Sequence, residues 1–127
     1  MKRTICVTLA ALLFAAVVCT ASNIIINRIV DHARHLRTEA VEAMEKHDVQ
    51  RVEQTLVELA EYIQDNQFWL EVFCEHDDLH DIKVQIIDAQ ASIEFGIEDD
   101  FYQAIYRFGE GLEHIADVEN IRLSNLC

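Results

Sequence analysis

The stretch Thr4–Asn27, TICVTLAALLFAAVVCTASNIIIN, carries no charged side chain over 24 consecutive residues and follows the basic pair Lys2-Arg3. A helix of this length is about 36 Å long at a rise of about 1.5 Å per residue, enough to cross the apolar core of a bilayer. We therefore predict an N-terminal transmembrane helix, and the pattern that follows it decides how the rest of the chain folds.

Three interpretations of this stretch stay open. In the favoured one, residues 1–27 remain attached as a membrane anchor; in the others they form a cleaved secretory signal, or Cys19 carries a lipid. Thr20-Ala21-Ser22 provides a small-residue site for cleavage, yet Ile24-Ile25-Ile26 prolong the apolar segment beyond that site. Val18 precedes Cys19 where lipid modification needs a small residue. We therefore predict a single-pass protein with an uncleaved anchor.

The charges beside the anchor give a preference for its orientation. A basic pair precedes the apolar stretch, and basic residues next to a membrane helix favour the cytoplasmic side. Arg28, Arg34 and Arg37 follow the stretch and oppose that preference. Because the N-terminus is laid out like a signal, we expect residues 28–127 on the extracytoplasmic face of the cell membrane.

The part of the chain after the anchor is strongly acidic. The net charge is −13, and residues 1–37 hold five basic side chains and one acidic side chain, net +4, so the remainder carries −17. Such a surface repels nucleic acid and anionic lipid headgroups. We expect no nucleic-acid partner and no cofactor, which leaves cationic proteins, divalent ions and neutral helical surfaces as candidate partners.

The spacing of apolar residues predicts an all-α domain, an antiparallel bundle of about four helices on the transmembrane helix. Proline is absent, and no glycine precedes Gly96, so long helices are permitted. The chain after the anchor is expected to continue as a helix and to end at Lys46-His47-Asp48, with Asp48 capping the next helix. The apolar face of this first helix is formed by Ile29, Ala33, Leu36, Ala40 and Met44.

A second apolar pattern covers residues 49–63 at alternating spacings of three and four. Leu70 and Phe73 continue the same face of the helix. The polar residues between them permit an interruption, so we predict either one helix to about Cys74 or a kink near Asn66.

The third predicted helix has two apolar stripes and is therefore expected at the centre of the bundle. Asp77 or Asp78 is expected to cap its start, and Gly96 is expected to end it. The fourth helix follows the acidic run Glu98-Asp99-Asp100, and residues 117–127 are expected to form a short separate segment that folds back. The two stripes of the third helix are formed by Leu79, Ile82, Ile86, Ala89 and Ile93, and by Val84, Ile87, Ala91 and Phe95.

Residues within the run from about Asp48 to Leu126, about two thirds of the chain, carry a family resemblance. They are Trp69, Phe73, His76, Leu79 and Ile82, then His114-Ile115, Glu119 and Leu123-x-Asn125-Leu126. This set resembles domain-of-unknown-function family 4363, a group of uncharacterised, N-terminally anchored small proteins of Gram-positive spore-forming bacteria. The resemblance implies a membrane-attached helical domain in an envelope or sporulation setting and implies no catalytic residues. The sequence departs from the family pattern at His80, where an acid is usual.

A cluster of histidines and acids gives an alternative function. His76 and His80 are one helical turn apart beside Asp77 and Asp81, and helical histidines at this spacing can share a metal ion. The competing interpretation is a structural turn in which His76 lies among capping acids. The alternative function is therefore a divalent-cation-binding or sensing domain that uses these four residues.

The four cysteines provide no disulfide framework. Cys74 and Cys127 are the one pair outside the apolar segment, and no CxxC motif is present. A bridge between these two cysteines is compatible with export, and two free thiols are the favoured interpretation.

Aromatic residues mark the predicted contact surface. Trp69, Phe73, Tyr102 and Tyr106 lie at helical spacings that usually indicate core, and those that are exposed would form a partner-binding patch. No activated nucleophile and no phosphate-binding glycine loop is recognisable, so we expect no enzyme. We predict a non-enzymatic protein–protein interaction module of the cell envelope, held in the membrane by residues 4–27, whose partner is another membrane or envelope protein.

Overall fold

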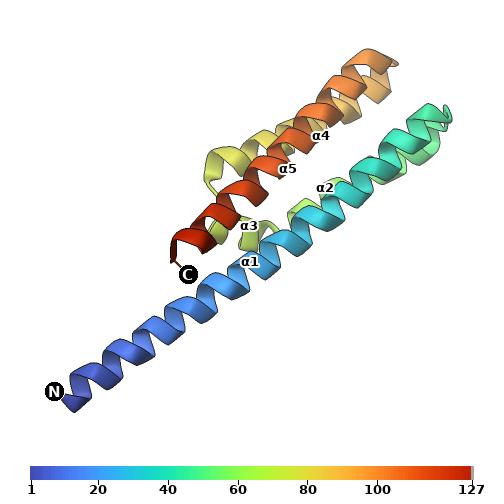
Figure 1. Ribbon diagram of the computed structural model, residues 1–127. Helices are drawn as coiled ribbons and strands as arrows, with labels where there is room; N and C mark the ends of the chain where they lie inside the picture. The colour runs from blue at the N-terminus through green and yellow to red at the C-terminus, as the bar shows by residue number, and fades with distance from the viewer. Residues whose placement is uncertain (127) are drawn as a thin grey trace.

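The computed structural model describes residues 1–126, which form five helices and, within that range, no strand. The prediction of an all-α fold with a long apolar N-terminal helix is confirmed. α1 is one unbroken helix whose first half projects from the rest of the molecule (Figure 1). The helices are α1 (Lys2–Glu45), α2 (Val49–Asp65), α3 (Gln67–Phe73), α4 (His76–Phe95) and α5 (Glu98–Leu126).

Four of the helices form an antiparallel bundle. α1 and α4 each pack against α2 and α5, so α1 and α4 occupy opposite corners (Figure 1). The turns at residues 46–48 and 96–97 lie at the end away from the N-terminus, which we call the far end. α3 and the last turns of α5 lie at the near end, beside the projecting part of α1. Short turns between successive helices produce this up-and-down arrangement.

The expectation that the third helix is central is wrong, because only one stripe of α4 is buried. Leu79 and Ile82 face the core, whereas Ile87 is 61% exposed and Phe95 is 74% exposed. A helix at the corner of a four-helix bundle buries the face between its two neighbours and leaves the other face to solvent. The second apolar stripe of α4 therefore has no helix to cover it.

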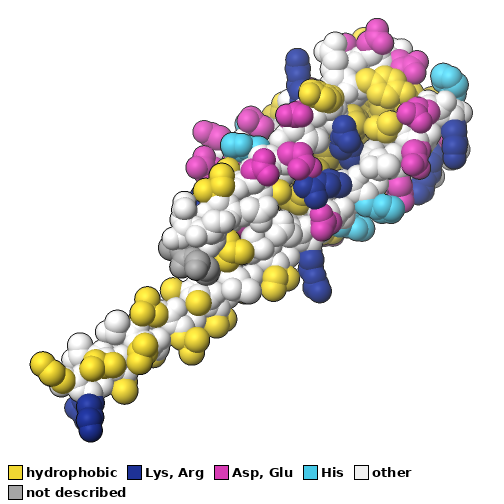
Figure 2. Space-filling view, in the orientation of Figure 1, with side chains coloured by type: hydrophobic (Ala, Val, Ile, Leu, Met, Phe, Trp, Pro, Cys, Tyr) yellow, Lys and Arg dark blue, Asp and Glu magenta, His cyan; other side chains and the backbone are white. Residues whose placement is uncertain are grey.

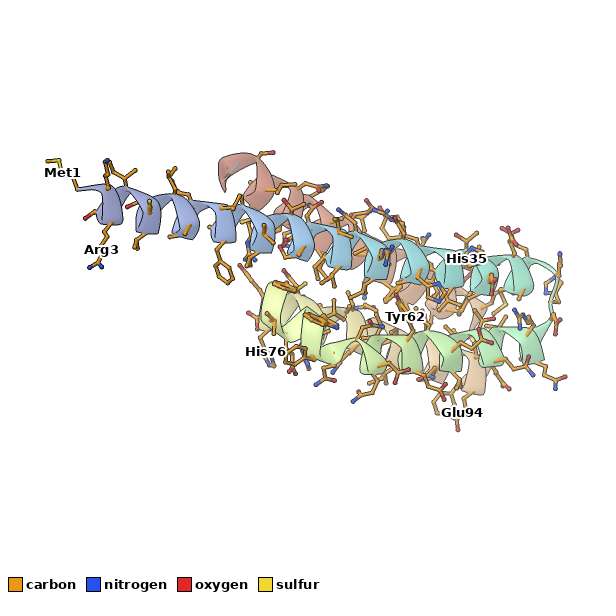
Figure 3. All side chains as sticks on the ribbon, turned by 90° about the horizontal axis from the view of Figure 1, so that it is seen from below. Met1, Arg3, His35, Tyr62, His76 and Glu94 are labelled. Carbon is orange, nitrogen blue, oxygen red and sulfur yellow. The ribbon has the colours of Figure 1, made fainter. Side chains whose placement is uncertain are left out.

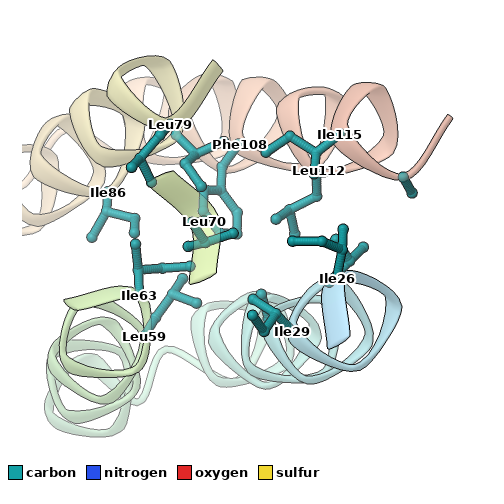
Figure 4. Close-up of a cluster of buried hydrophobic side chains, with 14 of the residues drawn as sticks. Ile26, Ile29, Leu59, Ile63, Leu70, Leu79, Ile86, Phe108, Leu112 and Ile115 are labelled. Carbon is teal, nitrogen blue, oxygen red and sulfur yellow. The ribbon is translucent and has the colours of Figure 1, made fainter. Parts of the chain in front are cut away.

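The core is built from side chains of all five helices (Figure 4). Leu70 of the short α3 lies 1% exposed among residues of the four long helices, so it closes the near end of the core. Phe101 and Phe108 of α5 are fully buried, and burying such a side chain contributes about 1.5–3 kcal/mol. The labelled residues of this cluster are Ile26, Ile29, Leu59, Ile63, Leu70, Leu79, Ile86, Phe108, Leu112 and Ile115.

Two of the predicted helix boundaries are confirmed. The Asp48 side chain accepts a hydrogen bond of 3.2 Å from the backbone N–H of Arg51 and caps α2. Gly96 ends α4 in the left-handed conformation, with φ of 69°, which costs glycine little. The chain also bends at Asn66, one of the two outcomes expected there, and the Asn66 side chain donates to the carbonyl of Tyr62.

The predicted cap of the third helix is wrong. α4 begins at His76, and the residue before it, Glu75, makes no side-chain capping hydrogen bond. Asp77 and Asp78 lie inside the first turn, where their charges complement the helix dipole.

The separate last segment expected at residues 117–127 is also wrong, because α5 continues to Leu126. Two glycines inside α5 are places where other side chains approach closely. A Cβ atom at Gly109 would lie 2.7 Å from Nε of Arg37, and one at Gly111 would lie 2.7 Å from Cγ2 of Ile82. Packing against neighbouring helices therefore holds these residues helical.

Candidate functional site

The first half of α1 presents an apolar surface with no protein partner. None of residues 1–21 is buried, and Figure 2 shows apolar side chains along this segment with basic side chains at its tip. Within the described residues, α1 is the one helix long and apolar enough to cross a membrane. A signal sequence near the N-terminus passes the same test of length and composition. Burial begins at Ser22, so the segment before it is not needed to complete the bundle core.

A buried polar pair joins α1 to α5 where α1 leaves the bundle. Oγ of Ser22 donates a hydrogen bond of 2.7 Å to Oε1 of Glu119, and both residues are 6% exposed. Beside it, the Asn23 side chain donates to the Asn120 side chain at 3.1 Å. This contact between α1 and α5 was not identified from the sequence. The one available sequence signal was an acid, Glu119, one helical turn after an apolar position. These bonds set Glu119 and Asn120 of α5 level with residues 22–23 of α1, and α5 continues six residues further, to Leu126.

A half-buried thiol lies close to this joint. Cys74 follows α3, and its pKa is raised to about 11, chiefly because burial disfavours the thiolate. The negative charges of Glu119 and Asp78 raise this pKa further, and Arg122 lowers it. A thiol that is neutral near pH 7 is a poor nucleophile. Cys127, the second cysteine of the less favoured bridge, lies outside the described residues.

The predicted metal-binding residues lie in the first two turns of α4, at the near end of the bundle (His76 in Figure 3). In the part of the chain that the structure describes, no three His, Cys, Asp or Glu side chains are grouped to hold one ion. The metal-site hypothesis therefore gains no support from the geometry and stays a prediction. All four residues are exposed: His76, Asp77, His80 and Asp81.

A neighbouring acid pairs with a different histidine. Oδ1 of Asp78 lies 3.5 Å from Nε2 of His114, and this contact links α4 to α5. Because this contact is partly exposed to solvent, it is a surface interaction that contributes little to stability.

The four aromatic residues predicted as a contact surface fall into two separate groups. Trp69 and Phe73 of α3 stack with ring centroids 6.1 Å apart at the near end of the bundle. Tyr102 and Tyr106 lie in the first three turns of α5, at the far end. Trp69 and Tyr106 are exposed, whereas Phe73 and Tyr102 are half-buried. The fold therefore does not gather these residues into one patch.

The outward face of α4 forms another apolar surface. We call Val84, Ile87, Ala91 and Phe95 the α4 outer stripe; their spacings of three, four and four keep them on one side of the helix. The acids Asp88 and Glu94 are exposed on the same helix and give the stripe a negative border. Ile87 and Phe95 are exposed, whereas Val84 and Ala91 are half-buried. Exposed apolar residues with a polar rim are typical of protein contact sites.

Comparison with known proteins identifies one related group. The sequence model of a family described as "Domain of unknown function (DUF4363)" matches residues 20–126. The match begins two residues before Ser22, where α1 enters the core, so the family domain corresponds to the bundle. No curated protein and no solved structure matches the chain.

Proposed function

The chain belongs to this DUF4363 family of unknown function, and from that starting point we propose that it is a non-enzymatic, single-pass membrane protein whose helical domain binds another membrane protein. In this proposal the first half of α1 is an uncleaved tether. The bundle stands on the extracytoplasmic face, and the α4 outer stripe contacts the partner.

The observation that carries the proposal is the continuity of α1. The helix passes without a break from an exposed apolar segment into the bundle core, where Ile26 and Val30 are fully buried. An apolar helix surface in water is unfavourable by about 25 cal/mol per Å², and a bilayer removes that cost. A rigid helical connection also holds the bundle close to the membrane surface, because α1 has no flexible linker between the two parts.

The chemistry of the α4 outer stripe specifies the kind of partner. Ile87 and Phe95 are two turns apart on one helix face, which suits an amphipathic helix packed alongside. Asp88 and Glu94 border the stripe, so a partner helix with Lys or Arg beside its apolar face would be complementary in charge. Because the tether holds the chain in the membrane, such a helix is expected on a protein of the same membrane.

Site-specific photo-crosslinking in cells that make the full chain tests this proposal. A photoreactive amino acid at Ile87 is expected to give a discrete crosslinked product in the membrane fraction. The same amino acid at Val57, an exposed apolar position on α2, is the matched control and is expected to give none. Charge reversal by Asp88→Lys is expected to lower the yield at Ile87, because it would repel a basic partner helix.

Two results would count against the proposal, and they concern different parts of it. Recovery of the mature chain from the soluble fraction with its N-terminus near Ser22 would rule out the tether. Equal crosslinking at positions 57 and 87 in membrane-bound chains would rule out the α4 outer stripe as the contact surface.

A further inference from the structure

Five exposed apolar side chains surround the near end of the bundle, and we call them the apolar collar. Phe68, Trp69 and Val72 belong to α3 and are 65%, 41% and 55% exposed. Ile24 of α1 and Ile121 of α5 complete the set and are also exposed. The bundle core does not use these side chains, so their exposure needs another explanation.

Hydrogen bonds place the three parts of the collar at one level along α1. Nη1 of Arg122 donates a bond of 2.9 Å to the carbonyl oxygen of Phe73, which ties the end of α3 to α5. One turn earlier on α5, Glu119 accepts the bond from Ser22 of α1. The end of α3 and the turn of α5 that contains Glu119 are therefore level with residues 22–23 of α1. Figure 3 shows His76, just after α3, at the end of the bundle that faces the projecting part of α1.

This level coincides with the edge of the hydrocarbon layer that α1 would cross. The uncharged stretch begins at Thr4, and about 20 helical residues cross a hydrocarbon core of about 30 Å. Counted from Thr4, these residues end at Asn23. The collar then lies at the height of the lipid headgroups, and residues 122–126 of α5 extend from it towards the hydrocarbon layer. Tryptophan and other aromatic side chains are enriched at this height, because their rings are apolar and their edges tolerate water.

α3 is held with its apolar face directed away from the bundle. Leu70 is buried in the core, and Nζ of Lys83 donates a hydrogen bond of 2.6 Å to Oε1 of Gln67, which ties α3 to α4. Phe68 and Val72 are one turn apart on the exposed side. A seven-residue helix is too short to be stable alone, so these contacts fix its position.

We propose that the near end of the bundle rests in the interfacial layer of the bilayer, with α3 on the membrane surface and Phe68, Trp69 and Val72 among the lipid headgroups. This inference rests on the proposed tether and specifies how the bundle sits on the membrane. The charges of Glu71 in α3 and of Glu75 after it are offset by Lys83 and Arg122, which bond to Gln67 and Phe73 at the two ends of α3. Net attraction to anionic lipid is therefore not expected. The association is driven by transfer of apolar surface from water, and zwitterionic lipid suffices.

Trp69 is the single tryptophan of the chain, which makes its fluorescence a direct probe. The full chain is reconstituted into phosphatidylcholine vesicles that contain lipids brominated either near the headgroup or deep in the acyl chain, and flotation first verifies that the vesicles carry the protein. Bromine near the headgroup is expected to quench Trp69 strongly, and deep bromine is expected to quench it weakly. The matched control is Trp69→Phe with Val57→Trp, which places the tryptophan on α2, eight residues and about 12 Å before the end of that helix at Asp65 and away from the bilayer. This variant is expected to show little quenching.

The outcomes separate this inference from the proposed function. Floating vesicles in which Trp69 is no more quenched than the tryptophan at position 57 would overturn the interfacial placement and leave the tether intact. That result would make the collar a surface for a protein or for a second copy of the chain. A chain that does not float with the vesicles would overturn both the tether and the interfacial placement.

Discussion

Ser22 of α1 and Glu119 of α5, 97 residues apart in the sequence, are joined by a buried hydrogen bond of 2.7 Å. On one side of this bond α1 packs into the bundle, and on the other side none of the α1 residues is buried. The hydroxyl gives the buried carboxylate a donor, as buried polar groups require. The pair therefore fixes the height at which the bundle meets the projecting helix.

Ser22→Ala is expected to destabilise the bundle by about 1–3 kcal/mol, because it leaves the Glu119 carboxylate buried without this donor. Urea denaturation of the full chain in detergent micelles, followed by circular dichroism, measures the change. Ser124→Ala is the matched control, since Ser124 is exposed and bonds only to the Asn120 carbonyl. Equal effects of the two substitutions would contradict a structural role for the Ser22–Glu119 bond.

Gly111→Ala is expected to cost roughly 1 kcal/mol in spite of the better helix propensity of alanine. The new methyl group would lie 2.7 Å from Cγ2 of the buried Ile82, and overpacking of about 1–3 kcal/mol exceeds a propensity gain of about 1 kcal/mol. Adding Ile82→Leu removes the branch that clashes and is expected to restore stability. An increase in thermal midpoint on Gly111→Ala alone would show that α4 and α5 separate easily.

Gly109 and Arg37 are expected to be coupled in a double-mutant cycle. Arg37 Nε donates a 2.9 Å hydrogen bond to the carbonyl of Ile105. A methyl group at position 109 would displace the Arg37 side chain from this position. Gly109→Ala is therefore expected to gain about 1 kcal/mol in an Arg37→Ala background and to gain nothing in the wild type. Unfolding free energies of the four proteins give the coupling. Identical gains in both backgrounds would mean that the Arg37 hydrogen bond contributes nothing.

Cys74 is expected to react slowly with iodoacetamide, because its pKa is raised from 9.0 to about 11. At pH 8 its thiolate fraction, and hence its alkylation rate, is about 100-fold lower in the folded chain than in urea. Arg122→Gln is expected to slow the reaction further, since Arg122 lowers this pKa. The measurement uses a chain with Cys6, Cys19 and Cys127 replaced by Ala, and equal rates in the folded and unfolded chains would contradict it.

The same pKa has a consequence for stability at high pH. A pKa raised in the folded state means that the folded chain holds the Cys74 proton more tightly than the unfolded chain. Its stabilising contribution is fully present below about pH 9 and is lost as pH rises through about 11. Cys74→Ala is expected to flatten the fall in unfolding free energy across this window.

Zinc titration tests the alternative based on His76 and His80. With no group of three ligands among the described residues, we expect millimolar zinc to shift the thermal midpoint of the wild type no more than that of the His76→Ala/His80→Ala variant. A zinc-dependent rise that the double variant abolishes would instead support the cation-binding hypothesis.

Features that depend on neighbouring residues in the sequence were predictable. The unbroken course of α1, the cap at Asp48 and the stop at Gly96 follow from apolar spacing and from local backbone chemistry. The predictions for α4 failed where they needed knowledge of its neighbours. The sequence pattern of a second apolar stripe, such as the one that contains Ile87 and Phe95, is the same whether or not another helix covers the stripe.

The sequence by itself determined an acidic, all-helical domain that follows an uncharged apolar segment, because helix periodicity and charge are local properties of the chain. Only the tertiary structure decided that α4 occupies a corner, that α5 runs on to Leu126, and that the end of α3 lies level with Ser22. These relationships join residues far apart in the chain, and their energy comes from packing and hydrogen bonds between helices. Spacing along one helix carries no information about which helix lies opposite.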